Sequence, residues 1–408
     1  MNFHRKENMS YRERSAQRQR HHSARKPNRR NYRNKNSNIN PSRFINKAAS
    51  FTEETEYKPV NSFADFALND KTKATLEYLG FILPTPIQDQ CIPIALSGED
   101  VIGLANTGTG KTAAFALPII EKAVKSRDPV STLILAPTRE LAQQIDVDLR
   151  RFAAGQKVYS TLVVGGANIN QQIRQIKRGP HVIVGTPGRV KDLIQRRVLR
   201  LGQVSTFVLD EADRMCDMGF VGDIRSIASE LSVQRQTLCF SATMTPRVQE
   251  IVEEFMDNPT TIAVAKNVTN DHIEQNVIEA RDKSHKIDLL ENLLQTENYD
   301  KVIIFGETKY GVQRLADRLT KDDMAAVAIH GNKSQSQREK ALRTFKKGDV
   351  KIMVATDVAA RGLDIPNVSH VINFDAPKQY DDYIHRIGRT GRAGKGGQAL
   401  TFIDNPRI

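Results

Sequence analysis

The sequence contains 408 residues, 39% of them hydrophobic and 26% charged, which is enough for two domains that each bury a core. No apolar run approaches the roughly 20 residues of a membrane-spanning helix, and the arginine-rich N-terminus lacks the apolar segment of a secretory signal. We therefore expect a soluble protein; a bacterial-type cytosol or a nucleus fits best, and of the two we predict the cytoplasm. The three cysteines, Cys91, Cys216 and Cys239, stand far apart in apolar surroundings, so they indicate buried thiols and neither a disulfide framework nor a metal site.

The positive charge is concentrated at the N-terminus. Residues 1–50 hold 14 lysines and arginines against two acidic residues, Glu7 and Glu13, so 12 of the 13 net positive charges lie there. The segment is poor in aliphatic side chains and cannot bury enough apolar surface to offset the entropy of ordering. We predict a disordered basic tail over residues 1–60. It is either a solubilising extension or an arm that binds nucleic-acid phosphates by counterion release, and we favour the arm.

From residue 61 onward, short β-branched runs alternate with segments compatible with helices, which is typical of a parallel α/β sheet. A first series contains DVIGLA, STLILAP, HVIVGTP, TFVLDEAD and TLCFSAT, and a second contains KVIIFGET, AAVAIHG, VKIMVATD and SHVINFDAP. Residues 265–274 between them are polar. The sequence therefore predicts two tandem α/β domains, over 61–264 and 275–408, joined by a linker over 265–274, with the active site in the cleft between them.

The stretch ANTGTGKT, residues 105–112, follows an apolar run and fits a loop that holds phosphates. Gly108 and Gly110 allow backbone N–H groups to converge, and a helix that starts near Thr112 presents its positive end. Lys111 is expected to reach the outer phosphates and Thr112 to offer its hydroxyl to Mg²⁺. A glycine-rich turn is the alternative, and Ala105 stands where the usual pattern has glycine.

A pair of carboxylates ends the apolar run TFVLDEAD. Asp210 can hold hydrated Mg²⁺, and Glu211 can orient and deprotonate an attacking water. Acidic residues after a strand often only cap a helix. The phosphate loop upstream favours the catalytic interpretation.

Residues 210–213 spell Asp-Glu-Ala-Asp, and the phosphate loop has the form Ala-x-Thr-Gly-x-Gly-Lys-Thr. In both respects the sequence resembles the DEAD-box family of superfamily 2 RNA helicases, and the resemblance extends from about Phe63 to the C-terminus with the motifs in family order. It implies two RecA-like domains. It also accounts for Ala105.

The resemblance implies an ATP site that begins with an adenine-reading motif, GFILPTPIQ. Gln88 is expected to bond the adenine edge, because an amide can donate and accept together, and Phe81 to stack on the ring. Asp364 is expected near the ribose. The implied ATP-binding residues are Phe63, Phe81, Gln88, Ala105, Thr107, Gly108, Thr109, Gly110, Lys111, Thr112, Asp210 and Asp364. Thr112 and Asp210 are the implied Mg²⁺ ligands, partly through water.

The resemblance also implies contacts to the RNA backbone. The residues are Pro137, Thr138, Arg139, Gly166, Thr186, Gly188 and Arg189 in the first domain, and Gln335, Arg338 and Thr356 in the second. Arg139 and Arg189 could equally form surface ion pairs. We favour RNA, because these motifs follow predicted strands on the edge where ligands bind.

The remaining implied roles connect the two domains. Catalysis is assigned to Lys111, Glu211, Arg389 and Arg392, the two arginines stabilising charge on the γ-phosphate from the second domain. Coupling between nucleotide state and RNA is assigned to Asp213, Ser241, Thr243, His385 and Arg386. Hydrolysis is therefore expected only when the cleft closes.

The function implied is RNA-stimulated ATP hydrolysis coupled to local, non-processive opening of RNA duplexes or remodelling of RNA–protein complexes. The implied partners are single-stranded and duplex RNA, with little sequence preference and preference over DNA because of the 2′-hydroxyl. We expect a monomer with no membrane association. Two alternatives remain open, an ATP-gated RNA clamp and an ATP-independent annealing protein driven by the tail. Because family members generally continue beyond the point where this sequence ends, Ile408, we expect a second domain that is either incomplete or unusually trimmed.

Overall fold

The computed structural model describes residues 39–46, 57–106, 108–126, 128–264, 273–296, 299–360, 365–391 and 396–405. Most of the predicted tail, residues 1–38 and 47–56, lies outside them. So do three of the predicted site residues, Thr107, Asp364 and Arg392.

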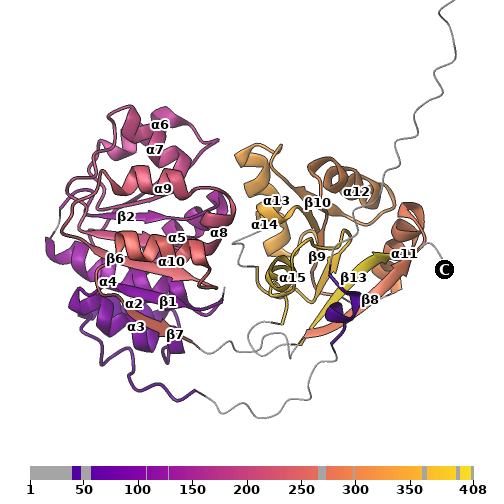
Figure 1. The fold of residues 1–408 in the computed structure, drawn as a ribbon, viewed down its shortest axis with the longest axis horizontal. Helices are drawn as coiled ribbons and strands as arrows, with labels where there is room; N and C mark the ends of the chain where they lie inside the picture. Colours follow the sequence, from indigo (N-terminus) through magenta and orange to yellow (C-terminus); the bar gives the residue numbers. More distant parts are fainter. Residues whose placement is uncertain are drawn as a thin grey trace, which may run out of the picture. The chain divides into compact units, whose positions relative to one another are not determined.

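The first lobe, residues 57–264, is built on a sheet of parallel strands (Figure 1). Its strands are β1 (Val101–Leu104), β2 (Thr132–Leu135), β3 (Ser160–Val163), β4 (Val182–Gly185), β5 (Thr206–Leu209), β6 (Gln236–Ser241) and β7 (Thr260–Ala263). Its helices are α2 (Asp70–Tyr78), α3 (Pro86–Ser97), α4 (Lys111–Ser126), α5 (Arg139–Phe152), α6 (Ile169–Ile176), α7 (Pro187–Gln195), α8 (Ala212–Asp217), α9 (Val221–Ala228) and α10 (Pro246–Phe255). The strand order is β3-β4-β2-β5-β6-β1-β7.

The second lobe, residues 273–405, is built on another parallel sheet. Its strands are β8 (Ile273–Ala280), β9 (Val302–Phe305), β10 (Ala326–Ile329), β11 (Ile352–Ala355), β12 (His370–Asn373) and β13 (Gly397–Asp404). Its helices are α11 (Lys283–Thr296), α12 (Lys309–Lys321), α13 (Gln335–Lys347), α14 (Asp357–Ala360) and α15 (Tyr380–Ile387). The order is β10-β11-β9-β12-β13-β8. The sheet begins at Ile273, two residues inside the predicted linker.

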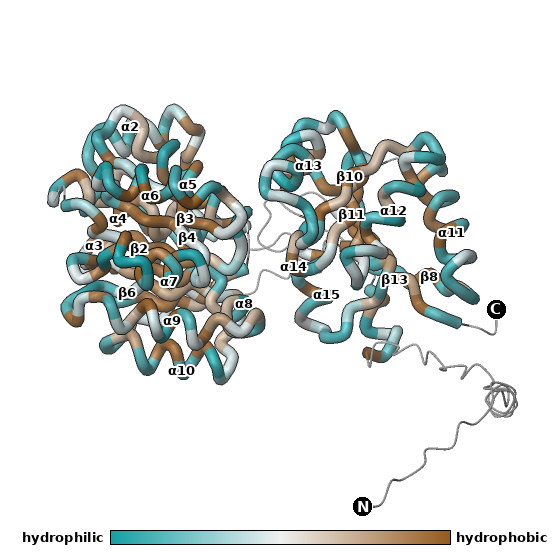
Figure 2. Tube along the Cα trace, turned by 90° about the horizontal axis from the view of Figure 1, so that it is seen from above, coloured by the Kyte–Doolittle hydropathy of each residue, from teal (hydrophilic) through white to brown (hydrophobic). Residues whose placement is uncertain are grey.

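Both sheets are sandwiched between helices, which confirms the predicted α/β class. Central strands such as β2, β4 and β5 are buried along their whole length, as continuous runs of β-branched and leucine residues require when both faces are covered. Figure 2 shows the strands as brown, apolar segments beneath more polar helices. The three cysteines are buried thiols, as expected. None of the described helices combines the length and apolarity needed to cross a bilayer.

The strand order of the first lobe decides where its motifs meet. Neighbouring strands β2, β5, β6 and β1 end in turn at Leu135, Leu209, Ser241 and Leu104. Because parallel strands point the same way, the residues that follow them gather at one edge of the sheet.

The end of the predicted tail differs from the expectation. Residues Pro41–Phe44 form a short 3-10 helix, η1, and Phe44 is fully buried. The contacts of this segment belong to the second lobe, beside β8 (Figure 1). Low apolar content predicted disorder here, but a single aromatic side chain with a binding pocket is enough to order a short turn.

Candidate nucleotide and RNA site

The predicted phosphate loop connects β1 to α4. Gly108 and Gly110 both have positive φ values, 88° and 91°, a conformation that a side chain disfavours. The Thr109 hydroxyl donates to the Asn106 carbonyl oxygen at 2.8 Å, which closes the turn. Lys111, the first residue of α4, is buried, and its Nζ donates to the carbonyl oxygen of Ala105 at 2.9 Å. The ammonium and the helix N-terminus therefore face the same loop.

Gln88 holds this loop from α3. Its Nε2 donates to the Gly110 carbonyl oxygen at 3.1 Å, and its Oε1 accepts from the Thr85 backbone at 3.0 Å. Thr85 adds a hydrogen bond from its hydroxyl to the Thr109 carbonyl oxygen at 2.8 Å. A Cβ on Gly110 would overlap the Gln88 amide. The predicted adenine-reading residue and the phosphate loop thus form one hydrogen-bonded unit.

The aromatic residues predicted for adenine lie together. Phe81 and Phe63 meet edge to face with ring centroids 5.8 Å apart, and Phe81 also contacts Phe152 at 5.6 Å. Phe63 is almost fully buried, whereas Phe81 is partly exposed. Phe81 is therefore the ring that can meet a ligand.

The acidic pair follows β5 in strained backbone. Glu211 has φ 53° and ψ 52°, left-handed values that cost a non-glycine residue of the order of 1–3 kcal/mol and cluster at functional sites. Both of its carboxylate oxygens are buried without a hydrogen-bond partner among the described residues. Among the described residues, Glu211 forms one ion pair, with Arg214, whose Nε lies 3.4 Å from Oε2 of Glu211. An under-satisfied carboxylate is suited to accept a proton or bind water.

Asp210 lies beside it. Burial raises the pKa of Asp210 to about 6, and the nearby Lys111 ammonium opposes this shift. A bound cation would reverse the effect of burial. The carboxylate, the Lys111 ammonium and the phosphate loop therefore fit a nucleotide phosphate group with Mg²⁺, and Thr112 lies at the start of the same helix. No group of three or more His, Cys, Asp or Glu with metal-binding spacing occurs in the described ranges.

Asp213 connects the acidic motif to the end of β6. Its Oδ2 accepts from the Thr243 hydroxyl at 3.0 Å and from the backbone N–H groups of Ala242 and Thr243. The Ser241 hydroxyl accepts from the Asp213 backbone N–H at 3.3 Å. The hydrogen bonds expected between these two motifs are thus present, while their role in coupling stays a prediction.

The predicted RNA contacts of the first lobe gather around Arg139. Its guanidinium packs so closely on Gly165 and Gly166 that a Cβ on Gly166 would overlap it. Arg189 donates to the Ala167 carbonyl oxygen at 3.4 Å and to Gln172 at 3.3 Å. One pocket is lined by seven predicted RNA contacts: Pro137, Thr138, Arg139, Thr186, Gly188, Arg189 and Arg338. Its described lining does not include Gly166, Gln335 or Thr356.

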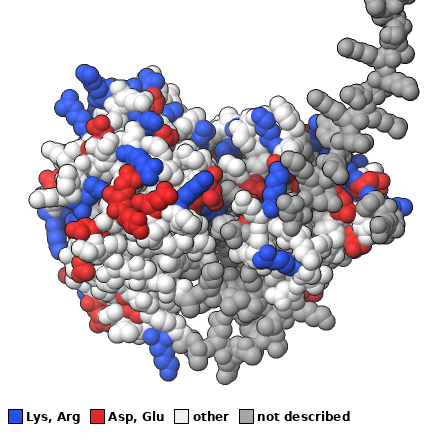
Figure 3. Space-filling model, in the orientation of Figure 1, with Lys and Arg blue, Asp and Glu red and all other residues white. Residues whose placement is uncertain are grey.

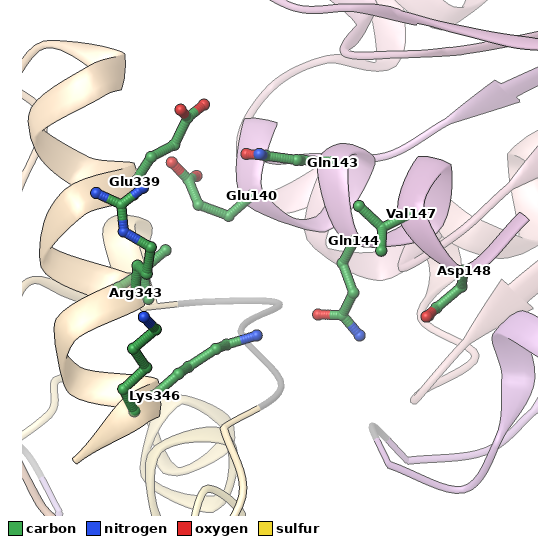
Figure 4. Close-up of a pocket in the computed structure, with 10 residues that line it drawn as sticks. Glu140, Gln143, Gln144, Val147, Asp148, Glu339, Arg343 and Lys346 are labelled. Carbon is green, nitrogen blue, oxygen red and sulfur yellow. The ribbon is translucent and has the colours of Figure 1, made fainter. Parts of the chain in front are cut away.

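Arg338 on α13 pairs with Glu140 on α5, Nη2 to Oε2 at 2.8 Å. Burial raises the pKa of Glu140, and Arg338 opposes that shift. Next to this pair, α5 and α13 line a second pocket, in which Figure 4 shows Gln143 and Arg343 among the lining residues. Glu140 lines this pocket and the predicted RNA pocket alike.

Helix α15 carries His385 and Arg386, two of the residues predicted for coupling, and it leads into Arg389, the described catalytic candidate of the second lobe. Arg386 makes a two-pronged ion pair with Asp357, at 2.6 and 2.7 Å, and donates to the Asp375 carbonyl oxygen at 2.7 Å. Arg389 is nearly fully buried and donates from Nε to the His385 carbonyl oxygen at 3.2 Å. Arg386 therefore anchors the helix, and Arg389 follows directly at its C-terminal end.

Three residues of the site were not singled out from the sequence. Thr85 supports the phosphate loop, Arg214 pairs with Glu211, and Asp357 holds Arg386. Thr85 could have been found, because Thr-Pro-x-Gln spells a helix cap with glutamine at the third helical position. Arg214 and Asp357 could not have been found, because their side-chain contacts do not follow from any spacing in the sequence.

Family models match both lobes. The model described as "DEAD/DEAH box helicase" matches residues 85–251, and "Helicase conserved C-terminal domain" matches residues 285–394. The DEAD-box ATP-dependent RNA helicase CshA of Geobacillus kaustophilus is 48% identical over 345 residues, which cover 84% of this chain and 74% of that protein. CshA of Bacillus subtilis is 47% identical over 343 residues, or 84% of this chain and 69% of that one.

Solved structures of RNA-bound proteins are similar to this chain over both lobes. Saccharomyces cerevisiae Dbp5 bound to RNA and ADP BeF3 is similar with a TM-score of 0.76 at 32% identity, over 84% of this chain and 90% of Dbp5. Mss116p bound to ssRNA and AMP-PNP gives a TM-score of 0.75 at 32% identity, over 83% of this chain and 73% of that one. The likeness takes in both sheets, and with it the expected RecA-like fold is confirmed.

Proposed function

The chain belongs to the DEAD-box family of ATP-dependent RNA helicases, and from this we propose which of its residues carry out hydrolysis and duplex opening. The enzyme is an RNA-dependent ATPase that opens RNA duplexes locally. The assignment of its residues rests most on one observation, the under-satisfied Glu211 carboxylate beside Asp210 and the phosphate loop.

In the first lobe, Gln88 and Phe81 select adenine, and the loop from Ala105 to Thr112 receives the phosphates. Lys111 neutralises their outer charge. Thr112 and Asp210 would hold Mg²⁺, which supplies further neutralisation of phosphate charge when bound. Glu211 orients the attacking water and accepts its proton, and neither of its carboxylate oxygens has a hydrogen-bond partner among the described residues.

Arg389 and Arg392 in the second lobe stabilise charge that develops on the γ-phosphate. Because Lys111 and Glu211 belong to the first lobe, neither half of the set is sufficient alone. Hydrolysis therefore requires closure of the two lobes.

RNA lies on the edge that carries Arg139, Gly166, Arg189 and Arg338. The contacts are to phosphates and 2′-hydroxyls, which accounts for weak sequence preference. A strand bent across both lobes cannot stay in an A-form helix, so a few base pairs open. The Asp213–Thr243 hydrogen bond transmits the nucleotide state to this edge.

We further propose that the protein acts in the cytoplasm as a monomer. Both halves of the catalytic set come from one chain, so no second copy is required. Outside residues 1–50 the net charge is close to zero, and Figure 3 shows basic and acidic side chains interspersed on the drawn face, so the basic tail is the part that attracts RNA at long range.

The first experiment measures steady-state ATP hydrolysis without nucleic acid, with single-stranded RNA, and with DNA of the same sequence. Single-stranded RNA, but not DNA, should stimulate ATP hydrolysis. Glu211→Gln should lower the RNA-stimulated rate about 100-fold or more while ATP-dependent RNA binding persists. The matched control is the exposed Glu230→Gln in the same lobe, which should behave as wild type.

Duplex opening separates this proposal from the alternatives. If the protein is a helicase driven by hydrolysis, Glu211→Gln cannot recycle and opens few duplexes. If the wild-type protein binds RNA in an ATP-dependent manner but does not open duplexes, the result would favour the ATP-gated clamp. Equal strand exchange with and without ATP would favour annealing by the tail.

A further inference from the structure

The N-terminal segment, residues 39–46, has a defined turn of its own. The Asn40 side chain accepts from the Ser42 backbone N–H at 3.1 Å and the Ser42 hydroxyl at 3.0 Å, and Pro41 starts the 3-10 helix. The turn places Arg43 and Phe44 next to each other on the second lobe, while Ile45 is 56% exposed. The segment therefore presents a specific pair of side chains.

Phe44 fills a pocket of the second lobe. It is fully buried in a cluster with Ile273 of β8, Ala399 of β13, and Tyr383 and Ile387 of α15. Its ring centroid lies 4.8 Å from that of Tyr383. The other buried members of this cluster come from α15 and from β8 and β13, the last two strands of the sheet, so Phe44 is the side chain that the N-terminal segment adds to the buried core there.

Two further contacts fix the segment on the same helix and sheet. The Arg43 guanidinium lies 3.8 Å above the Tyr380 ring, a cation–π contact with the first residue of α15. Asn46 and Gln275 of β8 exchange backbone hydrogen bonds at 3.0 and 2.8 Å. The Gln275 side chain in turn accepts from the Tyr383 hydroxyl at 2.9 Å, so strand, segment and helix share one residue.

The helix so held is the one that leads into the arginines. Tyr383 and Ile387 face Phe44, and Arg386 pairs with Asp357 on α14. Arg389 directly follows the C-cap residue Gly388, and its Nε donates a hydrogen bond to the carbonyl oxygen of His385. A shift of α15 must therefore move Arg389.

We propose that residues 39–46, although they precede the first lobe in the sequence, are a working part of the second, in which Phe44 is a positioning residue for Arg389. The Phe44 ring and the Arg386–Asp357 pair together fix α15. The inference rests on the proposed function for the role of Arg389, but the docking itself does not.

Docking is tested by fluorescence, because the sequence contains no tryptophan. In the full chain, Phe44→Trp should give blue-shifted emission that acrylamide quenches poorly. The neighbouring Ile45→Trp is the matched control and should emit like an exposed indole. Exposed emission from both variants would overturn the proposal, whatever the protein's catalytic activity.

Positioning is tested by steady-state kinetics. Phe44→Ala should lower kcat of RNA-stimulated hydrolysis roughly tenfold, since a small displacement of a positioned group can cost up to about 100-fold, and should leave the KM for RNA unchanged. Phe44→Leu should restore most of kcat, and Ile45→Ala should match wild type. A wild-type kcat for Phe44→Ala would refute positioning, and a selective rise in KM would show that the segment serves RNA binding instead.

Truncation guards against a variant that simply misfolds. Removal of residues 2–38 should keep kcat, and removal of residues 2–46 should lower it. A synthetic peptide of residues 38–46 added in trans should raise kcat of the shorter protein, whereas the same peptide with Phe44→Ala should not. If wild type shows no RNA stimulation at all, the proposed function fails while the fluorescence result still stands.

Discussion

Asp213 and Thr243 are joined by a hydrogen bond of 3.0 Å between the carboxylate Oδ2 and the threonine hydroxyl, across the ends of β5 and β6. The backbone N–H of Thr243 donates to the same oxygen at 3.0 Å. These hydrogen bonds connect the acidic motif after β5 to the motif after β6, as a coupling role for Asp213 and Thr243 would require.

Thr243→Val removes the hydroxyl but keeps the branched shape and the backbone donor. Losing one such hydrogen bond costs about 1 kcal/mol, so the fold should survive. We expect RNA-stimulated hydrolysis to stay near wild type while the rate of duplex opening falls about tenfold. Strand-separation assays at saturating ATP measure this. Thr243→Ser should restore opening, and equal losses in both activities for Thr243→Val would argue against a coupling role.

Gln88→Glu tests the contact between adenine recognition and the phosphate loop. A glutamate keeps the acceptor for the Thr85 N–H, but it replaces the donor to the Gly110 carbonyl with a negatively charged oxygen. We expect the Kd for ATP to rise tenfold or more, at least about 1.4 kcal/mol, in a titration with a fluorescent analogue. Gln90→Glu on the exposed side of α3 is the control. An unchanged Kd would separate Gln88 from the nucleotide.

Gly166→Ala tests whether the packing of the Arg139 guanidinium against Gly166 is needed for RNA binding. The new Cβ would overlap the guanidinium, so the arginine must leave its position. The RNA concentration for half-maximal hydrolysis should rise about tenfold, as expected when one charge-assisted hydrogen bond is removed, and ATP affinity should not change. Gly155→Ala is a matched control, because its φ of 73° is close to the 76° of Gly166 and nothing lies near its Cβ position. If both variants lose RNA affinity alike, backbone strain and not Arg139 is responsible.

His181 gives the first lobe a pH dependence. Burial lowers the pKa of His181 below its usual 6.5, and its Nδ1 accepts from the Tyr159 backbone N–H at 3.1 Å. As pH falls through 6.5 the unfolded chain takes up a proton before the folded chain does, so the free energy of unfolding decreases. Denaturant titrations between pH 7.5 and about 5.5 should show this fall, and His181→Asn should reduce its slope. An identical slope in the variant would assign the effect elsewhere.

Deletion of residues 2–38 tests the basic tail separately from the N-terminal segment. It removes 12 lysines and arginines together with Glu7 and Glu13. The RNA concentration for half-maximal hydrolysis should rise, and the slope of log affinity against log salt concentration should flatten by about 0.7 for each RNA phosphate that the tail no longer neutralises. Unchanged affinity and salt dependence would leave the tail as a solubilising extension.

Much of the site was predictable because parallel strands carry their motifs to one edge. Asp210, Glu211 and Ser241 each lie at or just beyond the end of a strand, so strand order brings them together, and the phosphate loop after β1 adds Lys111. The Arg214–Glu211 pair was not predictable, since the same sequence in an exposed helix would leave both charges in water. Phe44 was missed for a different reason. One aromatic residue in a polar stretch has no periodicity, and only its tertiary pocket reveals its role.

The bridge between Asn46 and Gln275 has a consequence for handling the protein. Strand β8 is the last strand of its sheet, and unpaired outer strands are templates on which extended chains associate and aggregate. In residues 39–46, Asn46 pairs with part of this outer strand, and Phe44 covers the apolar cluster formed by α15, β8 and β13. A shortened protein that starts at the first lobe would expose both, so poor solubility and concentration-dependent self-association are the behaviour to expect from it.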